Sequence, residues 1–259
     1  MNKIKMFLAN MTFAQKSAVI AALVAAMLAS FALYVRPTDE SDKAEPGKTV
    51  ALAQKPEYVR GIHITSWSAG SKKVRERFAM LFHETELNSA VIDIKEYQGE
   101  IYIPGIPLAE KHNLYVNAIP DLKDYIGELK KSGVYTIARI VVFKDNLLPR
   151  KRPDLAVKRP DGSVWQDHRR IAWVDPYNRE VWNYNLDIAA KAVEIGFDEI
   201  QFDYIRYPSD GDTKQCRYSY ANHNSSSSVL NLRNFLQEAS RRLKGMGARI
   251  SIDIFGLTP

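Results

Sequence analysis

Two aspartates, Asp203 in IQFDYIRYP and Asp253 in RISIDIFG, follow apolar segments that read as β-strands. Side chains alternate between the two faces of a strand, so each aspartate lies opposite a row of apolar residues. Hydrolysis of a glycosidic bond needs two carboxyl groups, one that donates a proton and one that attacks or activates water. Neighbouring strands are about 4.8 Å apart, so two such carboxyls can flank one bond. Asp203 and Asp253 are therefore the candidate catalytic pair, with a retaining or an inverting outcome both open.

Polar residues recur on the same inferred face of the other strands. His63 follows Ile62, Asp93 and Lys95 alternate with Ile92 and Ile94, and Arg139 lies between Ala138 and Ile140. Buried charges need partners or access to a ligand. One interpretation is an internal network in which Arg139 and Lys95 neutralise aspartates, and the other is direct contact with substrate.

Aromatic residues lie close to the ends of the predicted strands, among them Trp67, Trp173 and Tyr204. Aromatic faces beside polar groups suit sugar rings, although aromatic side chains also pack beneath long loops. Arg206 and Arg139 are candidates for orienting or tuning one of the two catalytic carboxyls. The candidate substrate-binding residues are His63, Trp67, Asp93, Lys95, Arg139, Trp173, Asp175, Gln201, Tyr204 and Arg206.

The pattern from residue 58 onward predicts alternating strands and helices. We expect strands at 61–67, 90–95, 135–143, 199–204 and 249–255, and helices at 72–87, 122–131, 179–195 and 229–244. Gly133 and Gly196 follow two of these helices, where a left-handed residue often ends a helix. The long connections follow strands, as in a (β/α)₈ TIM barrel, whose active site lies at the carboxyl ends of its strands. A doubly wound nucleotide-binding sheet is disfavoured because the first strand is not followed by GxGxxG.

The sequence contains five predicted strands, whereas a closed barrel has eight. We therefore expect residues 58–259 to be an incomplete barrel domain, truncated after the fifth strand. The alternative is a complete, open five-stranded α/β domain.

The N-terminal region predicts export. Residues 17–35 carry no charge, follow Lys3, Lys5 and Lys16, and are long enough for a transmembrane helix. Residues 1–35 are therefore predicted to be a membrane anchor, and the polar residues 36–57 a flexible linker. A cleaved signal peptide is the alternative, with a small-x-small site at 30–32. Either places the barrel outside the cytoplasm, anchored to the cytoplasmic membrane in the first case and secreted in the second.

Composition excludes several function classes. The net charge of +6 is not accompanied by a nucleic-acid-binding motif, so nucleic acid is not an expected partner. A single cysteine, Cys216, excludes an intrachain disulfide and a Cys-rich metal site. We expect no metal and no cofactor. The basic stretch 150–170 could attract an acidic glycan, although interspersed aspartates weaken its field.

Several motifs in order resemble a bacterial family of glycoside-hydrolase-like proteins first catalogued as a domain of unknown function. They are DEIQFDYIRYPSDG (198–211), RGIHITSW (60–67), AVIDIKEYQGEI (90–101), ARIVVFKDNLLPRKRPDLAV (138–157), AWVDPYNREVW (172–182) and SIDIFGLT (251–258). The resemblance implies a TIM-barrel glycosidase acting on an envelope or extracellular polysaccharide. It implies Asp203 as the nucleophile or key carboxylate and, by similarity to α-retaining glycosidases, Asp253 as the acid. The alternative is a non-catalytic glycan-binding or envelope scaffold protein on the same fold.

Overall fold

The computed structural model describes Gln15 and residues 54–254. The predicted anchor at 17–35, most of the predicted linker and Phe255 lie outside these residues. A search of the described part of the chain finds no helix with the length and apolar character to cross a bilayer.

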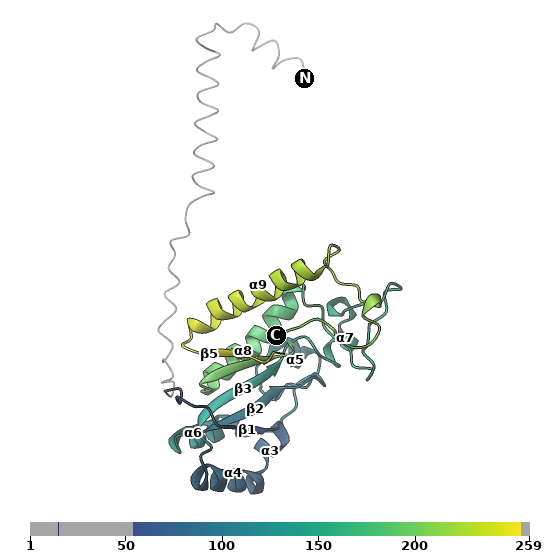
Figure 1. Cartoon of the computed structure of the whole chain (residues 1–259). Helices are drawn as coiled ribbons and strands as arrows, with labels where there is room; N and C mark the ends of the chain where they lie inside the picture. Colours follow the sequence, from purple (N-terminus) through teal and green to yellow (C-terminus); the bar gives the residue numbers. More distant parts are fainter. Residues whose placement is uncertain (1–14, 16–53, 255–259) are drawn as a thin grey trace. The chain divides into compact units, whose positions relative to one another are not determined.

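The domain is built on a five-stranded parallel sheet with the strands in sequence order (Figure 1). The strands are β1 Gly61–Ile64, β2 Ser89–Lys95, β3 Tyr135–Val141, β4 Glu199–Asp203 and β5 Arg249–Ile252. All five predicted strands are present, and the prediction of a parallel α/β sheet is confirmed. Strands β1, β3, β4 and β5 end earlier than predicted.

Helices connect successive strands. They are α3 Ser66–Gly70, α4 Lys72–Glu84, α5 Pro107–Lys111, α6 Leu122–Lys131, α7 Leu148–Lys151, α8 Arg179–Ile195 and α9 Ser225–Lys244, with 3₁₀ turns η1 Pro153–Leu155 and η2 Thr213–Gln215. The bounds of α6 and α8 are as predicted, and Gly133 and Gly196 have the expected positive φ, 77° and 121°. Helix α9 begins earlier than predicted, because Asn224 and Ser227 form a capping box.

The two faces of the sheet differ in chemistry. Parallel strands in sequence order, joined by right-handed crossovers, place their helices on one face. Apolar residues of neighbouring strands line this face in register, including Ile64, Ile92, Ala138 and Ile200, all fully buried. Helix α8 packs on β3 and β4, and α9 lies beside α8 and packs on β5 (Figure 1). We call the opposite face, which carries His63, Asp93, Arg139 and Gln201, the inner face.

A β-bulge near the end of β2 changes which side chains reach the inner face. Asp93 pairs with Arg139, but Lys95 pairs with Ile140, so Ile94 is one extra residue. Lys95 therefore lies on the helix side. It is fully buried, with its Nζ 3.0 Å from Asp145 Oδ2 and 2.7 Å from the carbonyl oxygen of Val141. The expectation that Lys95 follows Asp93 onto the inner face is wrong, because strict alternation fails at a bulge.

Candidate active site

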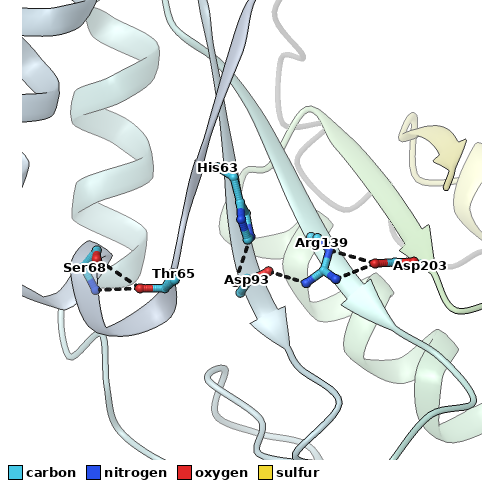
Figure 2. Close-up of polar contacts among 6 residues, drawn as sticks. All are labelled: His63, Thr65, Ser68, Asp93, Arg139 and Asp203. Atoms are coloured by element: carbon cyan, nitrogen blue, oxygen red, sulfur yellow. Dashed lines mark hydrogen bonds and ion pairs between the residues drawn. The ribbon is translucent and has the colours of Figure 1, made fainter.

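The site is organised around the guanidinium of Arg139 on the inner face. Nη1 of Arg139 donates to Asp93 Oδ1 at 2.7 Å, and Nε donates to Asp203 Oδ2 at 3.1 Å. Nη2 forms a second hydrogen bond to the same Asp203 oxygen. Figure 2 shows the guanidinium between the two carboxylates, which come from β2 and β4. Arg139 thus neutralises part of the charge of both, as the network interpretation expected.

His63 extends this network to β1. Its Nε2 lies 2.9 Å from Asp93 Oδ2, so both oxygens of the fully buried Asp93 carboxylate have a partner (Figure 2). The hydrogen bond to Asp93 is the main cause that raises the pKa of His63. Burial alone would raise the pKa of Asp93, but hydrogen bonds from His63, Glu96 and Arg139 outweigh it, and the pKa is lowered.

Glu96 is part of the site although sequence reasoning did not select it. Burial, followed by hydrogen bonding with Asp93 and the negative charge of Asp93, raises the pKa of Glu96 to about 7. Because the bulge places Lys95 on the helix side, the next residue, Glu96, can reach the inner face. A bulge has no reliable sequence signal, so only the acidic residue directly after the strand could have suggested it.

Asp203 is held at the point where β4 ends. Its Oδ1 accepts a hydrogen bond from the backbone N–H of Tyr204 at 2.6 Å, and Oδ2 accepts from Arg139. Tyr204 has φ 51°, a left-handed conformation that is unfavourable for a residue with a Cβ. Such strain is often found at functional sites. The turn and the ion pair together fix the orientation of the Asp203 carboxylate.

Asp253 lies beside Asp203, directly after β5. Its backbone N–H donates to the carbonyl of Phe202, and its Oδ1 accepts a hydrogen bond from Gln201 Nε2 at 2.8 Å. Burial, followed by the negative charge of Asp203, raises the pKa of Asp253. The two aspartates thus differ in environment: Asp203 is paired with the cation Arg139, whereas burial and the charge of Asp203 raise the pKa of Asp253.

Several predicted substrate-binding residues lie in other surroundings. Trp173 is fully buried and packs edge-on against Tyr204. Asp175 is buried, and its carboxylate accepts from the backbone N–H groups of Tyr177 and Ser219. Both side chains therefore support the loops. Trp67 is 62% exposed, but it lies on α3 because Thr65 caps that helix, so its predicted position on β1 is wrong.

Arg206 lies over two aromatic rings of the same loop region. Its guanidinium carbon is 4.9 Å from the ring centre of Tyr204 and 5.3 Å from that of Trp173. Lys144 contacts the same pair of rings and forms an ion pair with Asp167. Arg206 and Lys144 are thus packed against the same two rings. One of these rings belongs to Tyr204, the residue with positive φ that follows Asp203.

A family profile described as "Putative glycosyl hydrolase domain" matches residues 61–259. The chain belongs to this family. A solved structure of a hypothetical protein from Ruminiclostridium thermocellum is 33% identical, with a TM-score of 0.69, and the alignment covers 76% of this chain and 100% of that one. No curated protein sequence shows significant similarity to the chain.

Distant structural neighbours support the fold of the family. The α-galactosidase from Lactobacillus brevis has a TM-score of 0.51 at 12% identity, with 76% of this chain and 27% of that chain covered. The α-L-fucosidase isoenzyme 2 from Paenibacillus thiaminolyticus has a TM-score of 0.52 at 15% identity, with 75% and 32% covered. The chain thus spans about a third or less of these two enzymes, and the similarity concerns the arrangement of strands and helices.

Proposed function

We propose that the protein hydrolyses glycosidic bonds in an envelope or extracellular polysaccharide, with Asp203 as the nucleophile or key carboxylate and Asp253 as the acid. The observation that carries this proposal is the contrast between the two neighbouring aspartates. Asp203 forms an ion pair with Arg139, whereas burial and the charge of Asp203 raise the pKa of Asp253. A carboxyl group with a raised pKa beside a carboxylate that is paired with a cation suits acid catalysis next to an anion.

The test compares Asp203→Asn with wild type on a panel of aryl glycosides and bacterial polysaccharides. We expect turnover to fall by at least about 1000-fold, because Asn cannot attack or accept a proton. Circular dichroism and the unfolding midpoint check that the fold is kept. Asp161→Asn is the matched control, since Asp161 lies in an exposed loop, where its carboxylate bonds only Ser163 among the hydrogen bonds of the described residues. Unchanged turnover in Asp203→Asn would contradict the assignment.

The same panel distinguishes a non-catalytic glycan-binding or scaffold protein. If wild type forms no product, and an Asp203→Asn, Asp253→Asn double variant binds a glycan as tightly as wild type does, the protein binds glycan without hydrolysing it. Loss of product with retained binding in the double variant supports hydrolysis.

We also propose that the five units form part of a (β/α)₈ arrangement and that the N-terminal segment exports the domain. The strand order and the polar inner face support the first. The uncharged run at 17–35, preceded by lysines, supports the second, with an anchor favoured over a cleaved signal.

A further inference from the structure

A cavity of about 340 Å³ lies among the segments that follow β3 and β4. We call it the tyrosine recess, and the residues that line it include Tyr177, Arg179, Ser219, Tyr220, Asn231 and Asn234. These segments leave the carboxyl ends of their strands, which is the end that carries the active site in a barrel. Arg139, Asp203 and Asp253 are not among the lining residues, so the recess is separate from the candidate active site.

Two buried polar side chains hold the walls of the tyrosine recess in place. Asp175 accepts from the backbone N–H of Tyr177 at 3.0 Å and from that of Ser219 at 2.6 Å, so it joins the loop after β3 to the loop after β4. Asn231 of α9 donates to the carbonyl oxygen of Pro176 at 2.8 Å and so adds the third wall. The recess is therefore preformed, as ligand sites usually are.

A pair of stacked tyrosines supplies the aromatic surface of the recess. The ring centres of Tyr177 and Tyr220 are 5.0 Å apart, with 27° between the ring planes. Tyr177 is fixed in turn, because its phenol oxygen lies 2.9 Å from Ser227 Oγ. Tyr220 is 45% exposed, which leaves part of its ring open to a ligand. An aromatic surface of this kind suits the apolar C–H face of a sugar ring.

Polar side chains with unused hydrogen-bonding capacity surround these rings. The side chains of Arg179, Ser219 and Asn234 line the recess and hydrogen-bond no residue in the described part of the chain. A guanidinium donates, whereas a hydroxyl and an amide both donate and accept, so together they match the hydroxyl groups of a sugar. No acidic side chain is among the described residues that line the recess, so a cationic ligand has no counter-charge there.

We propose that the tyrosine recess is a second saccharide-binding site, in which one sugar ring lies against Tyr220 and its hydroxyl groups bond Arg179 and Asn234. The proposal rests on the proposed function only in taking the saccharide to be part of the same polymer. A chain held in the recess and at the two catalytic aspartates has two points of attachment. The second attachment is then intramolecular, which raises the affinity for long chains over that for short ones.

The first experiment reads the recess directly by fluorine NMR. The full chain is labelled with fluorotyrosine, Tyr220→Phe and Tyr58→Phe assign two resonances, and glucose-, galactose- and N-acetylglucosamine-based oligosaccharides are titrated in. We expect the Tyr220 resonance to shift saturably with at least one of them. Tyr58 is the matched control, because it is also exposed but precedes β1, and its resonance should stay in place. No saturable shift of Tyr220 with any of these oligosaccharides would overturn the proposal.

The second experiment repeats this titration in Asn234→Ala. The affinity read at Tyr220 should fall about 10-fold, because the sugar loses a hydrogen-bonding partner inside the site. The unfolding midpoint checks that the fold is kept. Asn222→Ala is the matched control, since Asn222 is exposed in the loop before α9 and does not line the recess, and its affinity should equal that of wild type. Wild-type affinity in Asn234→Ala would contradict the assignment.

The Asp203→Asn, Asp253→Asn double variant shows whether the two sites are separate. The Tyr220 shift should persist in it, because neither aspartate lines the recess. Loss of the shift in this variant would mean a single site and would overturn the proposal. All three measurements read binding and not turnover, so a failure of the second site is distinguishable from a failure of the proposed hydrolysis.

Discussion

At the scale of single residues, Arg139 on β3 hydrogen-bonds two carboxylates, Asp93 on β2 and Asp203 on β4. A guanidinium is planar and has five N–H donors, so Nε and Nη2 can donate to Asp203 while Nη1 donates to Asp93. A lysine ammonium at this position is a point charge on a flexible chain. The geometry of the site, and not only its charge, therefore depends on arginine.

Arg139→Lys should separate the effect of geometry from that of charge. We expect it to fold, because the positive charge between the aspartates is retained, but to lower kcat by about 10- to 100-fold, because Asp203 loses its two-donor contact. The measurement is steady-state kinetics beside thermal unfolding of the same preparations. Wild-type kcat in Arg139→Lys would show that charge alone suffices.

Asp253 leads to a prediction about leaving groups and pH. Burial and the charge of Asp203 raise its pKa, so the carboxyl is protonated at low pH and loses its proton as pH rises. If it is the acid, kcat/KM falls on the alkaline side, and Asp253→Ala removes this limb. The variant should lose much less activity on a dinitrophenyl glycoside, whose leaving group needs no proton, than on an oligosaccharide. Equal losses on both substrates would argue against an acid role.

Strand alternation grouped most of the inner-face residues from the sequence, with Lys95 as the exception. His63, Asp93, Arg139, Gln201 and Asp203 lie on one face, as their mutual contacts and the strand register confirm. Their roles in catalysis or substrate binding stay predictions. Trp173 and Asp175 could not be placed in the same way, because a loop has no period from which burial can be read.

At the scale of elements, helices with a clear stop signal were predicted well, and short ones were missed. Gly196 directly follows α8, and Ser132 and Gly133 follow α6, so the ends of both helices were evident. Helix α3 spans only five residues and begins in a segment whose apolar alternation resembles a strand. Its N-cap residue, Thr65, gives no clear signal, because threonine is common both at helix N-caps and within β-strands.

The bulge in β2 leads to a stability prediction. Lys95 and Asp145 form an ion pair in which both side chains are fully buried, on the side of the sheet away from Asp203. Lys95→Met leaves a buried carboxylate without its cation and should lower the free energy of unfolding by about 3–5 kcal/mol.

The second variant is Lys95→Met with Asp145→Asn. The Asn side chain keeps an acceptor for the backbone N–H groups of Leu147 and Leu148 but carries no charge, so much of the loss should be recovered. Chemical denaturation measures the free energy of unfolding of the single and of the double variant. A double variant no more stable than Lys95→Met would show that the cost lies in lost packing.

At the scale of the whole domain, apolar side chains are exposed around β5 and α9. Ile252 and Ile254 are 43% and 67% exposed, and Val229 and Leu230 of α9 are 69% and 54% exposed. Within residues 54–254, β5 pairs only with β4. In a (β/α)₈ barrel the next strand and helix cover such positions. The exposed apolar residues beside β5 therefore support the proposed barrel arrangement.

The N-terminal proposal can be tested by flotation with phospholipid vesicles. The full chain should float with the vesicles, and a chain that begins at Tyr58 should not, because the apolar run at 17–35 is then absent. Mass spectrometry of the exported protein separates the alternatives. An intact N-terminus indicates an anchor, and a start just after residue 32 indicates a cleaved signal.

Ile94 is the residue that the bulge leaves out of the pairing between β2 and β3, and this decides which charge lies next to Asp93. Lys95 is placed among the helices, where it pairs with Asp145. With Ile94 paired in the ladder, plain alternation would turn the ammonium group of Lys95 toward Asp93 and Arg139. One unpaired isoleucine thus keeps a second cation away from the two aspartates that Arg139 holds.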